Sequence, residues 1–117
     1  MDTQIDKQAH VTVVRPKGRL DFGAAGDFQA KVDQALAGDG KPPAAVIIDA
    51  SGLDYVSSAG LRVFLVGARN AKRAGTGFGV CALVPAVSEV FALSGFDRII
   101  KVSGSLDDAI AATGSGA

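Results

Sequence analysis

The stretch that decides the fold is Val46–Arg62, VIIDASGLDYVSSAGLR. It begins inside a continuously apolar run, Ala44–Ile48, which stops at Asp49. A short apolar run of this kind is typical of a strand that is buried on both faces, as in a parallel sheet. The next residues, 50–56, have the composition of a loop, and an amphipathic pattern begins at Ser57-Ser58. The stretch therefore predicts a buried strand, a loop and then a helix of about 16 residues.

This helix is predicted to have one apolar and one basic face. Gly75 is its predicted C-cap, because glycine adopts the left-handed conformation that ends many helices. The residues expected to point inward are Leu61, Phe64, Leu65, Ala68 and Ala71. The residues expected to point outward are Arg62, Arg69, Lys72 and Arg73.

The residues before the stretch predict strands followed by a helix. His10–Arg15 is β-branched and alternates, which indicates a strand, and residues 3–8 predict an edge strand before it. Gly18-Arg19-Leu20-Asp21 predicts a turn, with Asp21 as the N-cap of the helix that follows. Gly38-Asp39-Gly40 is expected to end this helix. Its predicted buried face consists of Phe28, Val32, Ala35 and Leu36.

The residues after the stretch continue the alternation of strands and helices. Phe78–Leu83 predicts a buried strand. Pro85 is expected in the first turn of a helix that ends by Gly95, and Ile99–Val102 predicts a last strand. The inner face of the Pro85 helix is expected to hold Val87, Val90, Phe91 and Leu93. Ser105 is the expected cap of a terminal helix.

The alternation predicts one α/β domain, with a mixed, mostly parallel sheet of about five strands and about four helices. We expect its core to span residues 5–112 and residues 113–117 to form a flexible tail. With 117 residues in all, the chain leaves no room for a second domain.

Composition disfavours several classes of function. Twelve Lys and Arg residues balance twelve Asp and Glu residues, so the chain lacks the basic excess of a nucleic-acid binder. One cysteine, Cys81, and one histidine, His10, cannot make a Cys/His zinc site. No apolar run approaches the ~18 residues that a spanning helix needs, and the N-terminus lacks an apolar signal core. We therefore expect a cytoplasmic protein that does not insert into membranes.

Motifs that suggest catalysis are each explained better by structure. The glycine cluster Gly75–Gly79 follows a helix and opens a strand, the reverse of the order in a dinucleotide-binding loop. Ser58-x-Gly60 matches half of a nucleophile elbow, but Val56 stands in place of the first glycine and His10 precedes the serine. Turns or caps are the expected roles of Asp21, Asp49 and Asp54. We therefore expect neither an enzyme nor a cofactor or metal site.

The pair Ser57-Ser58 remains open to two interpretations. A serine is a preferred N-cap, and this role explains one of the two residues. A helix N-terminus also favours a phosphate, because it presents unpaired N–H groups and a positive dipole end. Arg62 lies one turn further on and is placed to contact such a phosphate. The pair is therefore a cap, a phosphoacceptor or both.

The chain resembles the STAS domain family. Val46–Arg62 is similar to the family's signature, most closely that of the bacterial anti-sigma factor antagonists. Three further segments agree in order and spacing: Gly18–Asp21, the Ala74-Gly75 turn before FGVCAL, and Pro85–Phe96. The resemblance covers about residues 5–112 and implies a STAS-type fold.

The resemblance also implies a partner switch. The unphosphorylated antagonist would bind an anti-sigma factor that is also a serine kinase of the GHKL type, and so release a sigma factor. The kinase would then phosphorylate Ser58, which precedes Ala59-Gly60-Leu61 as in the family, and a PP2C-type phosphatase would reverse the step. Ser57 stands where the family often has Asp, and it is the second choice as acceptor. The expected contact face contains Asp21, Phe22, Asp54, Ser57, Ser58 and Arg62.

Other STAS roles stay open at this point. One is a structural scaffold in a large signalling assembly, and another is an accessory subunit of a lipid-transport ABC system, in which the serine is only a cap.

The charges are distributed unevenly along the chain. Residues 1–58 hold six basic and eight acidic groups, whereas residues 59–117 hold six and four, so the balance changes sign at Ser58.

Overall fold

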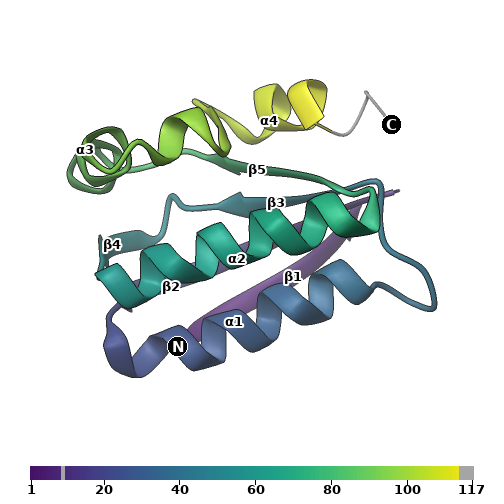
Figure 1. Cartoon of the computed structure of the whole chain (residues 1–117), viewed down its shortest axis with the longest axis horizontal. Helices are drawn as coiled ribbons and strands as arrows, with labels where there is room; N and C mark the ends of the chain where they lie inside the picture. The colour runs from purple at the N-terminus through teal and green to yellow at the C-terminus, as the bar shows by residue number, and fades with distance from the viewer. Residues whose placement is uncertain (9, 114–117) are drawn as a thin grey trace.

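The computed structural model describes residues 1–8 and 10–113 (Figure 1). Strands and helices alternate along most of the chain, as the sequence predicted. The strands are β1 (Asp2–Gln8), β2 (Val11–Leu20), β3 (Ala45–Asp49), β4 (Leu53–Val56), β5 (Gly77–Cys81) and β6 (Lys101–Ser103). The helices are α1 (Phe22–Ala37), α2 (Ser58–Ala74), α3 (Pro85–Leu93), the 3₁₀ turn η1 (Phe96–Arg98) and α4 (Leu106–Thr113).

The sheet has the strand order β1-β2-β3-β5-β6, and β4 pairs with the far end of β2. β1 runs antiparallel to β2, and all other pairs are parallel. The mixed, mostly parallel sheet and the edge strand before β2 are therefore confirmed. In this topology the ends of β2 and β4 lie side by side, so α1 and α2 begin next to each other.

Two boundaries around β2 and β4 were predicted wrongly. β2 continues to Leu20, where a turn was expected, and residues 53–56 form β4 inside the expected loop. Pro16 and Gly18 are ordinarily signals that end a strand. Here β2 changes its parallel partner: its residues up to Val14 pair with β3, and its residues from Gly18 onward pair with β4. Pro16 lies between these two ranges, where β2 has no parallel partner. The strand can therefore continue past it.

The core lies mainly between the sheet and the helices α1, α2 and α3, while α4 covers a smaller cluster on the other face (Figure 1). Three phenylalanines cross the larger cluster, with ring centroids 5.4 Å apart for Phe28 and Phe64 and 5.2 Å for Phe64 and Phe91. Cys81 is buried in the smaller cluster. The predicted buried face of α1 is confirmed in all four of its residues.

The buried face of α2 differs from the predicted one. Its fully buried residues are Gly60, Val63, Phe64, Gly67 and Ala71, whereas Leu61, Leu65 and Ala68 are only half-buried. The reason is that the helix approaches the sheet through its glycines. A Cβ at Gly67 would lie 3.0 Å from Cζ of Phe78. Gly75 adopts the left-handed conformation, with φ of 72°, and is the C-cap as predicted.

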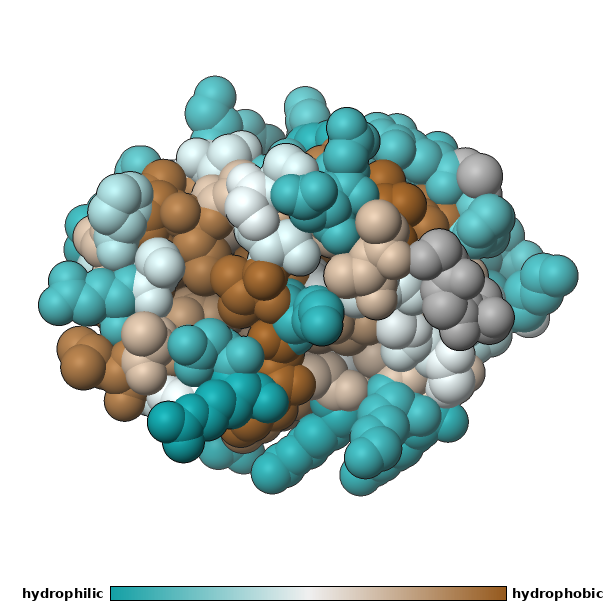
Figure 2. Space-filling model, turned by 90° about the horizontal axis from the view of Figure 1, so that it is seen from above, coloured by the Kyte–Doolittle hydropathy of each residue, from teal (hydrophilic) through white to brown (hydrophobic). Residues whose placement is uncertain are grey.

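The C-terminal third departs from the prediction at two places. Leu93 was expected to point inward but is 81% exposed, and Val90 is half-buried. The exposed Leu93 belongs to the side of the molecule that carries α3, where apolar side chains gather on the surface (Figure 2). β6 begins at Lys101 and not at Ile99, because the backbone N–H groups of Ile99 and Ile100 donate to the carbonyl of Phe96 and continue the turn of η1. Ser105 accepts a hydrogen bond from the Asp108 N–H, at 3.2 Å, and caps α4 as predicted. Of the predicted tail, Thr113 ends α4 and residues 114–117 lie outside the described chain.

The contact between Gly60 and Leu20 predicts a strong effect of a small substitution. A Cβ at Gly60 would lie 2.6 Å from Cγ of Leu20 and 2.9 Å from its carbonyl oxygen. We expect Gly60→Ala to lower the free energy of unfolding by about 1–3 kcal/mol, because the start of α2 must move. The matched control is Gly26→Ala in α1, where a Cβ would meet no atom within 4 Å. It should stabilise the protein by about 0.5–1 kcal/mol. Urea unfolding measures both, and equal stability of the two variants would contradict the close contact.

Candidate functional site

Ser57 joins β4 to α2 and is the N-cap of the helix. Its backbone is extended, with φ of −81° and ψ of 172°, and its Oγ accepts a hydrogen bond from the Gly60 N–H at 3.1 Å. Its own N–H donates to the carbonyl oxygen of Leu20 at 2.9 Å. Ser57 is half-buried. Its two hydrogen bonds fix it on both sides, to the helix that it caps and to the end of β2.

Ser58 is the first residue of α2 and is exposed. Its hydroxyl makes no hydrogen bond to the described part of the chain. It stands next to the N–H groups of the first turn, where the helix dipole favours negative charge, and that turn contains no acidic residue. The two serines therefore differ in role: Ser57 holds the helix start, and Ser58 presents a free hydroxyl at it.

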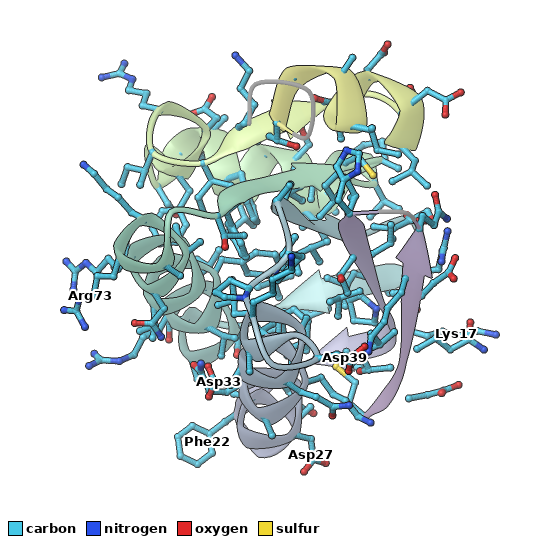
Figure 3. The ribbon with its side chains drawn as sticks, turned by 90° about the vertical axis from the view of Figure 1, so that its right-hand side faces the viewer. Lys17, Phe22, Asp27, Asp33, Asp39 and Arg73 are labelled. Carbon is cyan, nitrogen blue, oxygen red and sulfur yellow. The ribbon has the colours of Figure 1, made fainter. Side chains whose placement is uncertain are left out.

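The turn between β2 and α1 lies beside this helix start, because Ser57 is bonded to Leu20. Asp21 caps α1, with Oδ1 accepting from the Ala24 N–H at 3.0 Å, as the sequence predicted. The next side chain, Phe22, is 85% exposed and points away from the molecule (Figure 3). Asp21, Phe22, Ser57 and Ser58 are thus brought together from two loops that are distant in the sequence.

The remaining residues of the expected contact face are Asp54 and Arg62. Asp54 is exposed on β4, and Arg62 is exposed on the second turn of α2. Neither side chain forms an ion pair within the described residues. Two cavities, of about 640 and 400 Å³, are lined by other residues. The surface around Ser58 therefore offers exposed side chains to a partner.

The division between the serines predicts that alanine substitution destabilises the protein at Ser57 and has little effect at Ser58. Ser57→Ala removes the cap of α2 and is expected to lower the free energy of unfolding by about 0.5–2 kcal/mol. Ser58→Ala removes an unbonded, exposed hydroxyl and should change it by less than about 0.5 kcal/mol. Thermal unfolding followed by circular dichroism measures both variants. If Ser58→Ala loses more unfolding free energy than Ser57→Ala, then Ser58 and not Ser57 is the cap of α2.

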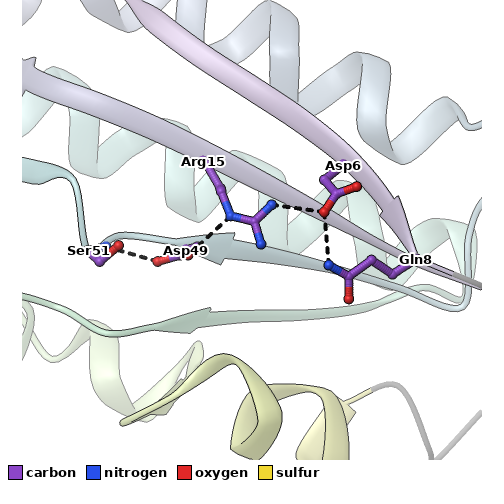
Figure 4. A network of polar contacts seen from close by, with 5 residues as sticks. All are labelled: Asp6, Gln8, Arg15, Asp49 and Ser51. Atoms are coloured by element: carbon purple, nitrogen blue, oxygen red, sulfur yellow. Dashed lines mark hydrogen bonds and ion pairs between the residues drawn. The ribbon is translucent and has the colours of Figure 1, made fainter.

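A polar network shapes the loop that leads to β4 (Figure 4). Arg15 lies between two carboxylates: its Nη1 is 3.1 Å from Oδ2 of Asp6, and its Nε is 3.4 Å from Oδ2 of Asp49. Oδ1 of Asp49 accepts a hydrogen bond from the Ser51 N–H at 3.1 Å, which confirms the expected turn role of this aspartate. The hydrogen bond from Gln8 and the one from Arg15 hold the pKa of Asp6 below its ordinary value. Sequence analysis missed this network because its members come from three strands.

Cys81 lies near this network, and its thiol predicts a dependence on alkaline pH. Burial, and then the negative charge of Asp49, raise the pKa of Cys81 to about 11, against the opposing effect of Arg15. The folded state therefore retains the proton between about pH 9 and 11, where the unfolded state has lost it. The stabilisation from the neutral thiol is full below pH 9 and is lost as the pH rises through 11. We expect unfolding free energies to fall more steeply over this range in the wild type than in Cys81→Ala, and parallel curves would contradict the burial of the thiol.

Comparisons with known proteins agree with this architecture. The STAS domain family matches residues 2–109. BtrV of Bordetella bronchiseptica, named as a candidate anti-sigma factor antagonist, is 45% identical over 67 residues. That match covers 57% of this chain and 58% of BtrV, so it spans less than two thirds of the relative.

Solved structures share the whole fold. An anti-sigma factor antagonist from Mycobacterium paratuberculosis is 28% identical, with a TM-score of 0.86 over 96% of this chain and 92% of that one. SpoIIAA of Bacillus in its phosphorylated form is 21% identical, with a TM-score of 0.69 over 93% of this chain and 96% of that one. No helix among the described residues is long and apolar enough to cross a membrane. The match to residues 2–109 and the shared fold show that this chain belongs to the STAS domain family.

Proposed function

We propose that the protein is an anti-sigma factor antagonist that is switched off by phosphorylation of Ser58. Unphosphorylated, it binds an anti-sigma factor that is also a GHKL-type serine kinase, and the bound sigma factor is released. The kinase phosphorylates Ser58 and the complex dissociates, after which a PP2C-type phosphatase restores the antagonist. The chain is a binding switch and a kinase substrate without catalysis of its own, and it works among cytoplasmic partners. The names of BtrV and of the mycobacterial protein support this assignment.

The observation that carries the proposal is the difference between the two serines. Ser57 is engaged at both its Oγ and its N–H, so its modification would remove the cap of α2. The Ser58 hydroxyl is exposed and unbonded, and a kinase can reach it without disturbing the helix. A phosphate at this position is also favoured by the dipole of α2. Ser58 is therefore the acceptor, and Ser57 is the residue that holds it in place.

A phosphate on Ser58 changes the surface and leaves the fold intact. It adds a charge of about −1.5 to −2 at neutral pH. The chain has a formal net charge of zero, so this one group sets the sign of the net charge. In a docked complex the new charge would be desolvated or placed next to acidic groups, and either situation opposes binding. SpoIIAA, which shares the fold, has been solved in both its unphosphorylated and phosphorylated forms.

The partner is proposed to contact the turn before α1 as well as the start of α2. Phe22 supplies a large, exposed apolar side chain to this surface, and aromatic residues are enriched in the buried cores of interfaces. The polar residues around it are Asp21, Asp54, Ser57, Ser58 and Arg62. The two parts are held together by the hydrogen bond from Ser57 to Leu20, so a partner can span both.

Purification of the tagged chain with its bound partner, followed by addition of Mg-ATP, tests the function. We expect a serine kinase to co-purify, to phosphorylate the chain once and then to be released. Ser58→Ala is the control, and it should remain bound after ATP is added. Co-purification with a transporter ATPase, with no phosphorylation, would contradict the proposal in favour of the lipid-transport role. A stable particle of high mass would favour the scaffold role.

A further inference from the structure

α2 carries three arginines in one line along its exposed side. Arg62, Arg69 and Arg73 are spaced by seven and four residues, which places them within about 40° of one another around the helix axis. We call these three residues the arginine stripe; all are exposed, and Lys72 lies beside them. Figure 3 shows Arg73 pointing away from the body of the molecule. α2 contains no acidic residue, and none of the three arginines forms an ion pair within the described residues.

The stability of the helix accounts for only part of this pattern. Lys72 and Arg73 occupy the last turn, where cations interact favourably with the helix dipole. Arg62 lies on the second turn and Arg69 before the last turn, so the dipole stabilises neither of them. Arg69 and Arg73, four residues apart, repel each other. The helix dipole therefore accounts for Arg73 but not for Arg62 and Arg69, as expected of residues that interact with a partner.

Ser58 lies on the same line as the stripe. It precedes Arg62 by four residues, which places it within about 40° of that residue around the helix axis. Ser58 and Arg73 are then about 22 Å apart along α2. The site of phosphorylation is thus one end of a continuous row, and the contact surface around Ser58 extends directly into the stripe.

We propose that the arginine stripe is a docking surface for an acidic face of the kinase, so that the contact extends along the whole of α2. The inference rests on the proposed function and adds the charge of the partner surface to it. Arginine fits this role because its planar guanidinium group pairs with carboxylates in a bidentate manner. A phosphate on Ser58 then opposes docking twice, since it repels the acidic face and competes for Arg62.

Neighbouring charges favour a protein partner over a nucleic acid. α1 packs beside α2 and carries an exposed carboxylate at Asp33 (Figure 3), while that of Asp27 pairs with the N-terminal ammonium group. Asp21 and Asp54 are exposed near the other end of the stripe. A uniformly negative polymer would be repelled by Asp21, Asp33 and Asp54, whereas a protein can place basic side chains opposite them. The stripe therefore fits a protein surface of patterned charge.

The test compares two double variants that each remove two cations. Arg69→Ala/Arg73→Ala empties most of the stripe, and Arg98→Ala/Lys101→Ala is the control on η1 and β6. Binding of the purified kinase from the co-purification experiment is measured by calorimetry, and circular dichroism checks that both variants are folded. We expect the first variant to bind about tenfold more weakly and the control to bind like the wild type. Raising the salt concentration from about 0.05 to about 0.5 M should weaken the wild type more than the first variant.

The other outcomes separate the two proposals. If the kinase binds the wild type and both variants equally well, the stripe is not a docking surface and the proposed function stands. If the kinase binds the wild type and both variants lose the same affinity, only the overall charge matters and the inference is wrong. If no kinase binds the wild-type chain, the proposed function fails, and the inference that rests on it fails too.

Discussion

Replacement of Ser58 by aspartate is expected to weaken binding of the kinase by more than a hundredfold. The substitution places a permanent negative charge on an exposed position at the head of α2, where the unmodified chain offers a neutral hydroxyl. A rise of ~3 kcal/mol in the free energy of the complex corresponds to this loss of affinity. Calorimetry with the purified kinase measures the change directly.

Two controls separate charge from shape at this position. Ser58→Asn has almost the size of the aspartate variant but no charge, and it should bind within about tenfold of the wild type. Ser58→Ala should bind like the wild type and accept no phosphate. If the asparagine and aspartate variants lose the same affinity, side-chain size and not charge controls the complex, and the electrostatic account of the switch is wrong.

Replacement of Phe64 by alanine is expected to cause the largest loss of stability. Phe64 is 1% exposed, and its ring lies between those of Phe28 and Phe91. Truncation of a buried phenylalanine costs about 3–5 kcal/mol, because it removes apolar contacts and leaves a cavity. Since a small domain is stable by about 5–15 kcal/mol, we expect a fall in melting temperature of more than about 10 °C.

Phe22→Ala is the matched control, because it removes the same side chain from a position that is 85% exposed. It should leave the melting temperature within about 2 °C of the wild type, since exposed substitutions change stability little. It should nevertheless weaken binding of the kinase by about tenfold or more, as expected of an aromatic anchor. A protein in which Phe22→Ala is as destabilising as Phe64→Ala would not have the core described above.

Local patterns predicted the parts of the fold that depend on neighbours in the sequence. The buried face of α1, the caps Asp21 and Ser105 and the helix end at Gly75 were all predicted, because each follows from residues within one or two turns. The continuation of β2 past Pro16 and the formation of β4 were missed. Both depend on a change of partner strand, which local sequence does not encode.

The candidate site shows the same division. The sequence identified Ser57-Ser58 but left the cap and acceptor roles open. The hydrogen bonds of Ser57 to Gly60 and Leu20 show that Ser57 is the cap, and Ser58 as acceptor is a proposal. Arg15 was not singled out at all, because its two carboxylate partners come from β1 and β3. Phe22 was placed on the expected contact face by resemblance, and its position near Ser58 in the structure follows from the pairing of β2 with β4.

We propose that Ser57 holds the helix and that Ser58 accepts the phosphate. Phosphosite mapping by tandem mass spectrometry, after incubation of the wild-type chain with its kinase and Mg-ATP, tests this claim most directly. We predict one phosphate per chain, located on Ser58, and no phosphate on Ser58→Ala. A phosphate on Ser57, with Ser58 unmodified, would contradict the assignment.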